Sequence, residues 1–186
     1  HNDAFALVLA QKGSGEFFQS VLAQAGDKDR LSDLLAGGAS GDKALGASFA
    51  QALVQSQPEA FAAAYKDAAH PENVPALEDA FQNSADLANA LFASTDPSVK
   101  EMVQKSFLTE ARFQPRISEL IRTDPTFPKN LFFQGGTPDL SRFESDSTFA
   151  LRLLETAPDL AQSLYTANDA RYKNRMEAVL FGGQVD

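Results

Sequence analysis

The residues with the clearest potential for chemistry surround His70, the only histidine apart from His1. Asp67 and Glu72 lie close to it in sequence, and Asp79 follows one helical stretch later. An imidazole held between a carboxylate and a nucleophile can act as a general base. No serine of this chain stands in a Gly-x-Ser-x-Gly motif, and His70 directly precedes a proline. We therefore expect a solvated loop histidine, and a carboxylate-based enzyme around Asp67 and His70 ranks third among our functional hypotheses.

Cations gather in the second part of the chain. Residues 1–93 hold 12 acidic and 5 basic side chains, whereas residues 94–186 hold 13 and 11. The densest cluster of cations comprises Lys100, Lys105, Arg112, Arg116, Arg122 and Lys129. This cluster could form a face for an acidic partner segment. Acidic residues are interleaved with it, however, and this pattern is also typical of a solvated helix surface with i,i+4 ion pairs.

Two adjacent phenylalanines, Phe132 and Phe133, follow this cluster. Neighbouring positions on a helix point about 100° apart, so one apolar seam cannot bury both rings. We expect Phe133 to contact another segment of the chain or a partner. The candidates for partner binding are accordingly Arg112, Arg116, Arg122, Lys129 and Phe133.

Several kinds of site are excluded by composition. The absence of cysteine removes disulfides, thiolate catalysis and zinc sites built on sulfur, and two histidines are too few for a histidine-rich metal site. A net charge of −9 argues against nucleic acid as a partner. No stretch approaches the roughly 20 apolar residues that span a bilayer. We predict no catalytic residue, no metal and no cofactor.

The elements that would position these side chains are short helices arranged in pairs. In Ser147–Ala167, apolar residues at Phe149, Leu153 and Leu154 have the spacing of an amphipathic helix. Proline fits the first position of a helix because its missing N–H would be unpaired there anyway. A second helix is therefore predicted to start at about Pro158, which makes a helical hairpin with one apolar seam.

The same pattern recurs five times along the chain. A large apolar residue, a small one and an apolar residue at i+4 are followed by a break that contains proline in four of the five cases. The apolar pairs are Phe5 and Leu9, Phe49 and Leu53, Leu87 and Leu91, Ile117 and Ile121, and Phe149 and Leu153, with breaks at Gly13–Gly15, Pro58, Pro97, Pro125 and Pro158. In the second helices, the apolar stripe lies two, six and seven positions after Gly15 or the proline of the break, and only Gln104 interrupts it.

These observations predict an all-α chain with about five degenerate helical hairpins, in a solenoid or a compact bundle, with little or no β structure. The units resemble α-solenoid repeats in architecture, although the tetratricopeptide signature is not met because the chain lacks tryptophan. We expect residues 1–186 to form one all-α helical-repeat domain, which could be a piece of a longer protein. No signal in the sequence assigns a compartment.

Stacked helical repeats expose an extended surface, so the leading functional hypothesis is a protein-interaction module whose partner is a peptide or a protein. The alternative is a carrier that holds an apolar ligand between helices, which the 15 phenylalanines would permit. A carrier requires a large enclosed apolar cavity, whereas an enzyme requires a cleft with carboxylates of raised pKa.

Overall fold

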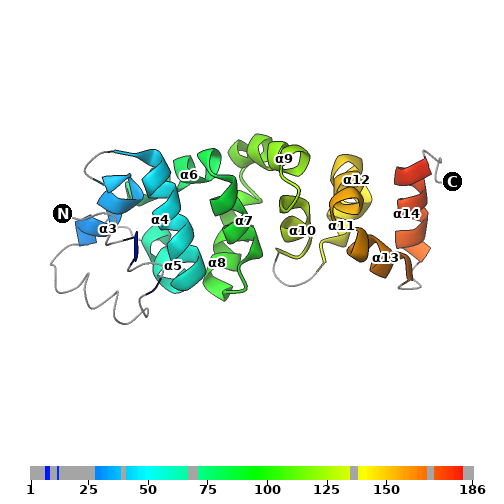
Figure 1. Ribbon diagram of the computed structural model, residues 1–186, viewed down its shortest axis with the longest axis horizontal. Coiled ribbons are helices and arrows are strands. Elements are labelled where there is room, and N and C mark those ends of the chain that lie inside the picture. The colour runs from blue at the N-terminus through cyan, green and yellow to red at the C-terminus, as the bar shows by residue number, and fades with distance from the viewer. Residues whose placement is uncertain are drawn as a thin grey trace. The chain divides into compact units, whose positions relative to one another are not determined.

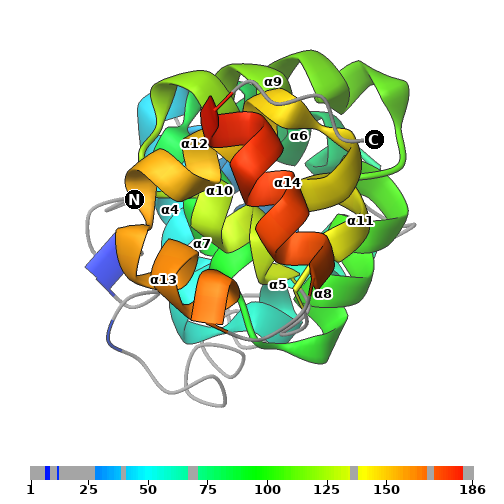
Figure 2. The same cartoon turned by 90° about the vertical axis from the view of Figure 1, so that its right-hand side faces the viewer.

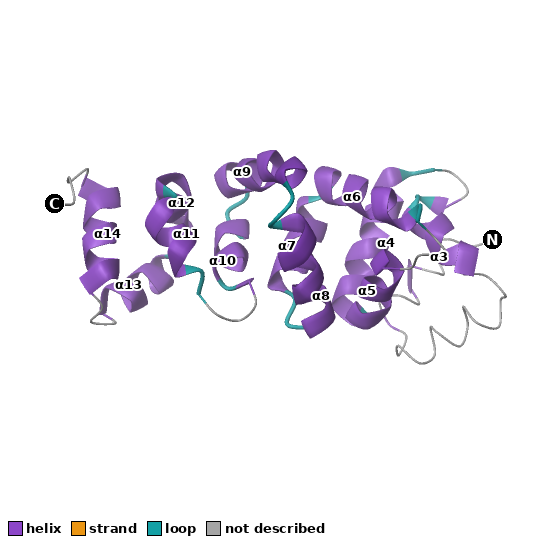
Figure 3. Ribbon diagram, turned by 180° about the vertical axis from the view of Figure 1, so that it is seen from behind, coloured by secondary structure: helices purple, strands orange, loops and turns teal. Residues whose placement is uncertain are grey.

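The structure is a computed structural model of the whole chain, and it describes residues 7–8, 12, 28–38, 41–66, 71–134, 138–166 and 170–181. These residues form helices and connecting turns, without a strand among them (Figure 1 and Figure 3). The predicted all-α class is confirmed. The first predicted hairpin, at residues 5–22, lies almost entirely outside the described residues, as do Asp67 and His70.

The chain divides into two compact units, His1–Phe113 and Gln114–Asp186, which we call unit 1 and unit 2. The described helices of unit 1 are α3 (Lys28–Leu35), α4 (Lys43–Ser56), α5 (Pro58–Lys66), α6 (Asn73–Asn83), α7 (Ala85–Ala93), α8 (Pro97–Met102), the π-helix η2 (Val103–Phe107) and the 3₁₀ turn η3 (Ala111–Phe113).

Unit 1 is built around α4, which packs against α3, α5, α6 and α7 (Figure 1). Asp42 caps this helix, because its carboxylate accepts hydrogen bonds from the N–H groups of Ala44 and Leu45. Phe49 and Leu53, the predicted apolar pair, are both buried. The chain then turns at Gln57 and α5 begins at Pro58, as the proline predicts.

Helix α4 approaches the end of α3 closely at Gly46. A Cβ atom at this position would collide with the carbonyl oxygen of Leu35, so only glycine fits. The connection between the two helices passes through Gly37 at φ +100°, a left-handed conformation that glycine adopts without strain.

Aromatic rings fill the core of unit 1 between α5, α6 and η2. The ring of Phe81 lies 4.7 Å from that of Phe107 and 5.6 Å from that of Phe113, while Phe107 and Phe113 are 4.7 Å apart. Tyr65 adds a fourth ring, 6.0 Å from Phe107. The three phenylalanines are almost fully buried, so this cluster is a main source of hydrophobic stabilisation in the unit.

The apolar register of two second helices differs from the prediction. In α5 the fully buried ring is Phe61, one position after Ala60, where the pattern places the first apolar contact. In α13 only Leu164 of the predicted stripe is buried, and Tyr165 is 49% exposed. After α8, the backbone widens into the π-helix η2, in which Val103 and Phe107 are buried and Gln104 is exposed, as its interruption of the stripe predicts.

Unit 2 contains α9 (Gln114–Thr123), α10 (Phe127–Phe132), α11 (Leu140–Ser145), α12 (Ser147–Thr156), α13 (Pro158–Thr166) and α14 (Ala170–Phe181). Helix α12 packs against α9, α10, α11, α13 and α14, and α13 also packs against α14 (Figure 2).

The core of unit 2 is likewise aromatic. Phe132 lies 6.2 Å from Phe143 and 6.5 Å from Phe149, and Tyr172 of α14 lies 6.3 Å from Phe143, all measured between ring centroids. These rings come from four different helices, so their contacts join α10, α11, α12 and α14 into one unit.

No helix among the described residues combines the length and the hydrophobicity that a bilayer crossing requires.

Candidate functional site

The five partner-binding candidates divide between the two units. Arg112 lies in η3 at the end of unit 1. Arg116 and Arg122 belong to α9, Lys129 to α10, and Phe133 follows α10, all in unit 2.

Arg112 is engaged by two carboxylates of its own unit. Its guanidinium makes a two-pronged contact with Glu78 of α6, with Nη2 2.6 Å from Oε1 and Nη1 donating to Oε2 at 2.7 Å. The second carboxylate is that of Glu110. Its Oε2 lies 2.6 Å from Nη2 of Arg112 and accepts a hydrogen bond from Nε at 2.7 Å. Planar, two-pronged pairing of this kind is the strongest geometry available to an arginine.

Glu78 is the less accessible partner of this pair, since its side chain is 13% exposed and that of Arg112 53%. The hydroxyl of Tyr65 donates to Glu78 at a long 3.5 Å. Burial raises the pKa of Glu78 above its ordinary value of 4.5; the charge of Arg112 opposes this rise and the charge of Glu110 adds to it.

Tyr65 belongs to the same network. Burial raises its pKa above 10.0, and a hydrogen bond with Ser106 of η2 acts in the opposite direction. A half-buried carboxylate, a tyrosine with a raised pKa and a π-helix therefore meet at one place, a combination that often marks functional sites. These groups engage one another, so the geometry supports an ion-pair network that holds the chain in position.

In unit 2, the predicted cations differ in availability. Arg116 has a side chain that is only 13% exposed, and its Nη1 donates to Glu119 at 2.8 Å. Arg122 and Lys129 are exposed, and no side chain among the described residues forms an ion pair with either. These two cations are the ones that could meet a partner without first losing an internal contact.

Phe133 is half-buried, and its ring stands edge-on to Phe132 at 5.0 Å. Phe132 itself is fully buried. Phe132 is thus more deeply buried than Phe133, which lies four positions after Lys129 in the sequence. The expected contact of Phe133 with another segment or a partner stays a prediction.

Of the four residues in the enzyme hypothesis, Asp67 and His70 lie outside the described residues. Asp79 is half-buried, with a side chain that is 42% exposed, and it pairs with Lys43 at 2.9 Å. Glu72 is exposed and precedes α6. Within the described part of the chain, no group of three potential metal ligands occurs.

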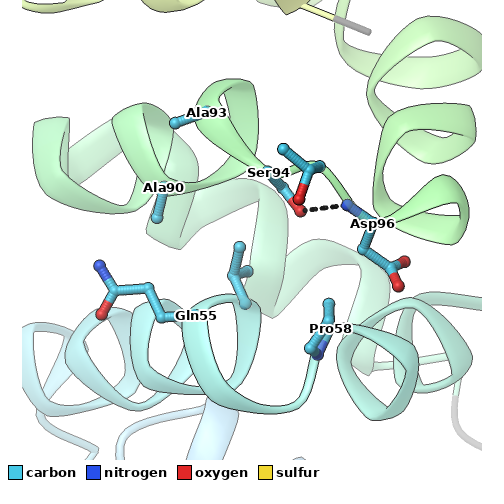
Figure 4. A pocket seen from close by; sticks show the side chains of 8 residues that line it. Gln55, Pro58, Ala90, Ala93, Ser94 and Asp96 are labelled. Atoms are coloured by element: carbon cyan, nitrogen blue, oxygen red, sulfur yellow. Dashed lines mark hydrogen bonds between the residues drawn. The ribbon is translucent and has the colours of Figure 1, made fainter. Parts of the chain in front are cut away.

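A cleft of about 300 Å³ lies between the end of α4 and the end of α7 (Figure 4). Its lining residues are Val54, Gln55, Pro58, Ala90, Ala93, Ser94, Thr95 and Asp96. The N–H of Asp96 donates to the Ser94 hydroxyl at 3.3 Å, and the Asp96 carboxylate accepts hydrogen bonds from Ser98 and Val99 of α8. The one carboxylate of this cleft is thus occupied by helix capping. The cleft is open and partly polar, which differs from the enclosed apolar cavity that a carrier needs.

Sequence reasoning missed Glu78, Glu110 and Tyr65 as members of the Arg112 network. Glu110 lies two residues from Arg112, and this proximity is a usable signal. Glu78 lies 34 residues away, and no local pattern brings it to η3.

Comparisons with protein-family models, with curated proteins and with solved structures find no match to this chain.

Proposed function

We propose that this chain is a protein-interaction module that presents a helical-repeat surface to a peptide or protein partner. The repeat arrangement is part of the proposal. Four helix pairs support it, each with a break at or near proline: α4 with α5, α7 with α8, α9 with α10, and α12 with α13. The first helix of each pair buries the large apolar residue and the apolar residue four positions later.

The observation that carries the proposal is the exposure of two cations on consecutive helices of unit 2. Helix α9 buries Ile117, Leu120 and Ile121 and leaves Arg122 exposed. Helix α10 buries Phe127, Leu131 and Phe132 and leaves Lys129 exposed. With the accessible part of Phe133, these residues favour a partner segment that carries acidic groups next to an apolar side chain.

Selection of peptides from a random displayed library on the intact chain tests this function. We expect the selected peptides to be enriched in Asp and Glu next to apolar residues. The double variant Arg122→Glu/Lys129→Glu should weaken their affinity by about tenfold, because it replaces attraction by like-charge repulsion at an exposed surface.

The matched control is Lys12→Glu/Lys100→Glu, which makes the same change of net charge in unit 1. It should leave the affinity close to that of the unchanged chain. Equal binding by the Arg122/Lys129 variant and the unchanged chain would refute this surface as the contact region.

A further inference from the structure

The last residues of unit 1 are held against α6 by two different kinds of contact. The ionic contact consists of Glu78 and Glu110 on either side of the Arg112 guanidinium, at 2.6–2.7 Å. The apolar contact is Phe113, which is 1% exposed and packs against Phe81 and Phe107. The guanidinium also lies over the ring of Phe113, at 4.9 Å from its centroid, so the two contacts are adjacent.

This place in the chain is where one compact unit ends and the next begins, because unit 2 starts at Gln114. The backbone of the segment has protected amides, since Glu110 donates to the carbonyl of Ser106 at 2.9 Å and Phe113 to that of Glu110 at 3.1 Å. Loosening the ionic contact would therefore change the protection of the amides in residues 110–113, the last residues of unit 1.

We propose that Glu78 and Arg112 form an acid-releasable latch that fixes the end of unit 1 on α6. When Glu78 takes up a proton, it loses the charge that holds the guanidinium, and Arg112 is left with the more exposed Glu110 alone. The release loosens residues 110–113, while the contact between Phe81 and Phe107 keeps the core of unit 1 intact. This inference goes beyond the proposed function, because it concerns the control of the chain's own conformation.

The groups that act on Glu78 come from each side of it. Tyr65 of α5 donates to it, Arg112 and Glu110 approach it from the end of unit 1, and Lys43 of α4 is occupied by the neighbouring Asp79. Burial raises the pKa of Glu78 above 4.5, so protonation begins at a milder pH than for an exposed glutamate.

Linkage gives the direction of the effect. Arg112 lowers the pKa of Glu78 when the two are in contact, so a protonated Glu78 must bind Arg112 less tightly. In the proposed release Glu78 keeps its place on α6 and loses only the charge of Arg112, so acidification favours the released state of the latch.

Hydrogen exchange of the intact chain, followed peptide by peptide at pH 7, tests the latch. The variant Glu78→Gln imitates the uncharged side chain at neutral pH. We expect exchange of the amides in residues 110–113 to accelerate roughly tenfold, because one charge-assisted contact is lost. The matched control is Asp79→Asn, which removes a charge at the next position of α6, where Asp79 pairs with Lys43 and accepts a hydrogen bond from Asn83. It should leave residues 110–113 unchanged.

A second measurement keeps the proposal testable if Glu78→Gln fails to fold. In the unchanged chain, exchange at residues 110–113, corrected for its intrinsic pH dependence, should accelerate as the pH falls from 7 to 4.5, the ordinary value above which burial raises the pKa of Glu78. Unchanged local exchange over this range would overturn the latch, as would an equal effect of Glu78→Gln and Asp79→Asn at pH 7.

Discussion

At the scale of single residues, the structure shows which cations are available to a partner, a difference that the sequence does not reveal. Arg112 and Arg116 are bound by carboxylates of their own units, whereas Arg122 and Lys129 are exposed without such an ion pair among the described residues. The difference arises from tertiary contacts, since Glu78 reaches Arg112 across 34 positions of sequence. Charge patterning alone cannot show which arginine is available to a partner.

The pairing of Arg112 predicts a pH-dependent loss of stability when the guanidinium is removed. In Arg112→Met, Glu78 keeps its burial but loses the charge that lowers its pKa, so its folded-state pKa rises further above 4.5. A carboxyl whose pKa is raised by folding contributes stability that is fully present below its unfolded-state pKa and is lost as the pH rises through the folded-state pKa. Urea unfolding should therefore show a larger decrease of the midpoint at pH 7 than at pH 5.5.

The matched control for this prediction is Arg122→Met, which removes an exposed arginine. Its effect should be small and similar at both pH values. A loss of stability in Arg112→Met that is the same at pH 5.5 and pH 7 would contradict the role given to Glu78.

At the scale of elements, the sequence predicts the helix breaks well where proline begins the second helix. Helices α5, α8 and α13 start at Pro58, Pro97 and Pro158. At Pro125, however, the helix starts two residues later at Phe127, and the proline of its first turn is Pro128. Pro125 instead lies in the preceding turn, in which the Asp124 carboxylate accepts hydrogen bonds from the N–H groups of Thr126 and Phe127.

The π-helix η2 is the element that sequence periodicity could not predict. An α-helical template places apolar residues by a fixed spacing, while a π turn inserts one residue and shifts that spacing. The π turn is seen in the backbone, where the N–H of Leu108 donates to the carbonyl of Val103, five residues earlier, at 2.9 Å. Gln104 interrupts the apolar stripe, but an exposed residue at this position also fits an ordinary α-helix, as Tyr165 of α13 shows.

Capping gives a prediction for α12, whose first turn depends on Asp146. Its Oδ1 accepts a hydrogen bond from the N–H of Phe149 at 2.9 Å, and the Phe149 ring is fully buried. The variant Asp146→Ala should lower the free energy of unfolding by about 1 kcal/mol, because an N–H of the first turn loses its partner. Urea denaturation followed by circular dichroism measures this loss.

Asparagine caps helices about as well as aspartate, so Asp146→Asn should retain most of the stability. If Asp146→Asn is as unstable as Asp146→Ala, the contribution of Asp146 is electrostatic and the capping explanation is wrong.

At the scale of the whole molecule, each unit has an aromatic core of its own. Phe81 lies among Phe107, Phe113 and Phe92 in unit 1. Phe149 lies beside Phe132 in unit 2. The sequence contains both clusters, but the repeating hairpins suggest one continuous array, and the division at Phe113 follows from contacts that only the folded chain reveals.

Separate cores predict that the two units lose stability separately. Phe81→Ala and Phe149→Ala each remove a fully buried ring, which costs about 3–5 kcal/mol in a well-packed core. In arrays of short helical units, such damage weakens the local unit most, because stability is a sum of local contributions. Hydrogen exchange should therefore accelerate in residues 28–113 for Phe81→Ala and in residues 114–181 for Phe149→Ala. Acceleration of both units to the same extent in either variant would mean that the chain unfolds as one cooperative body.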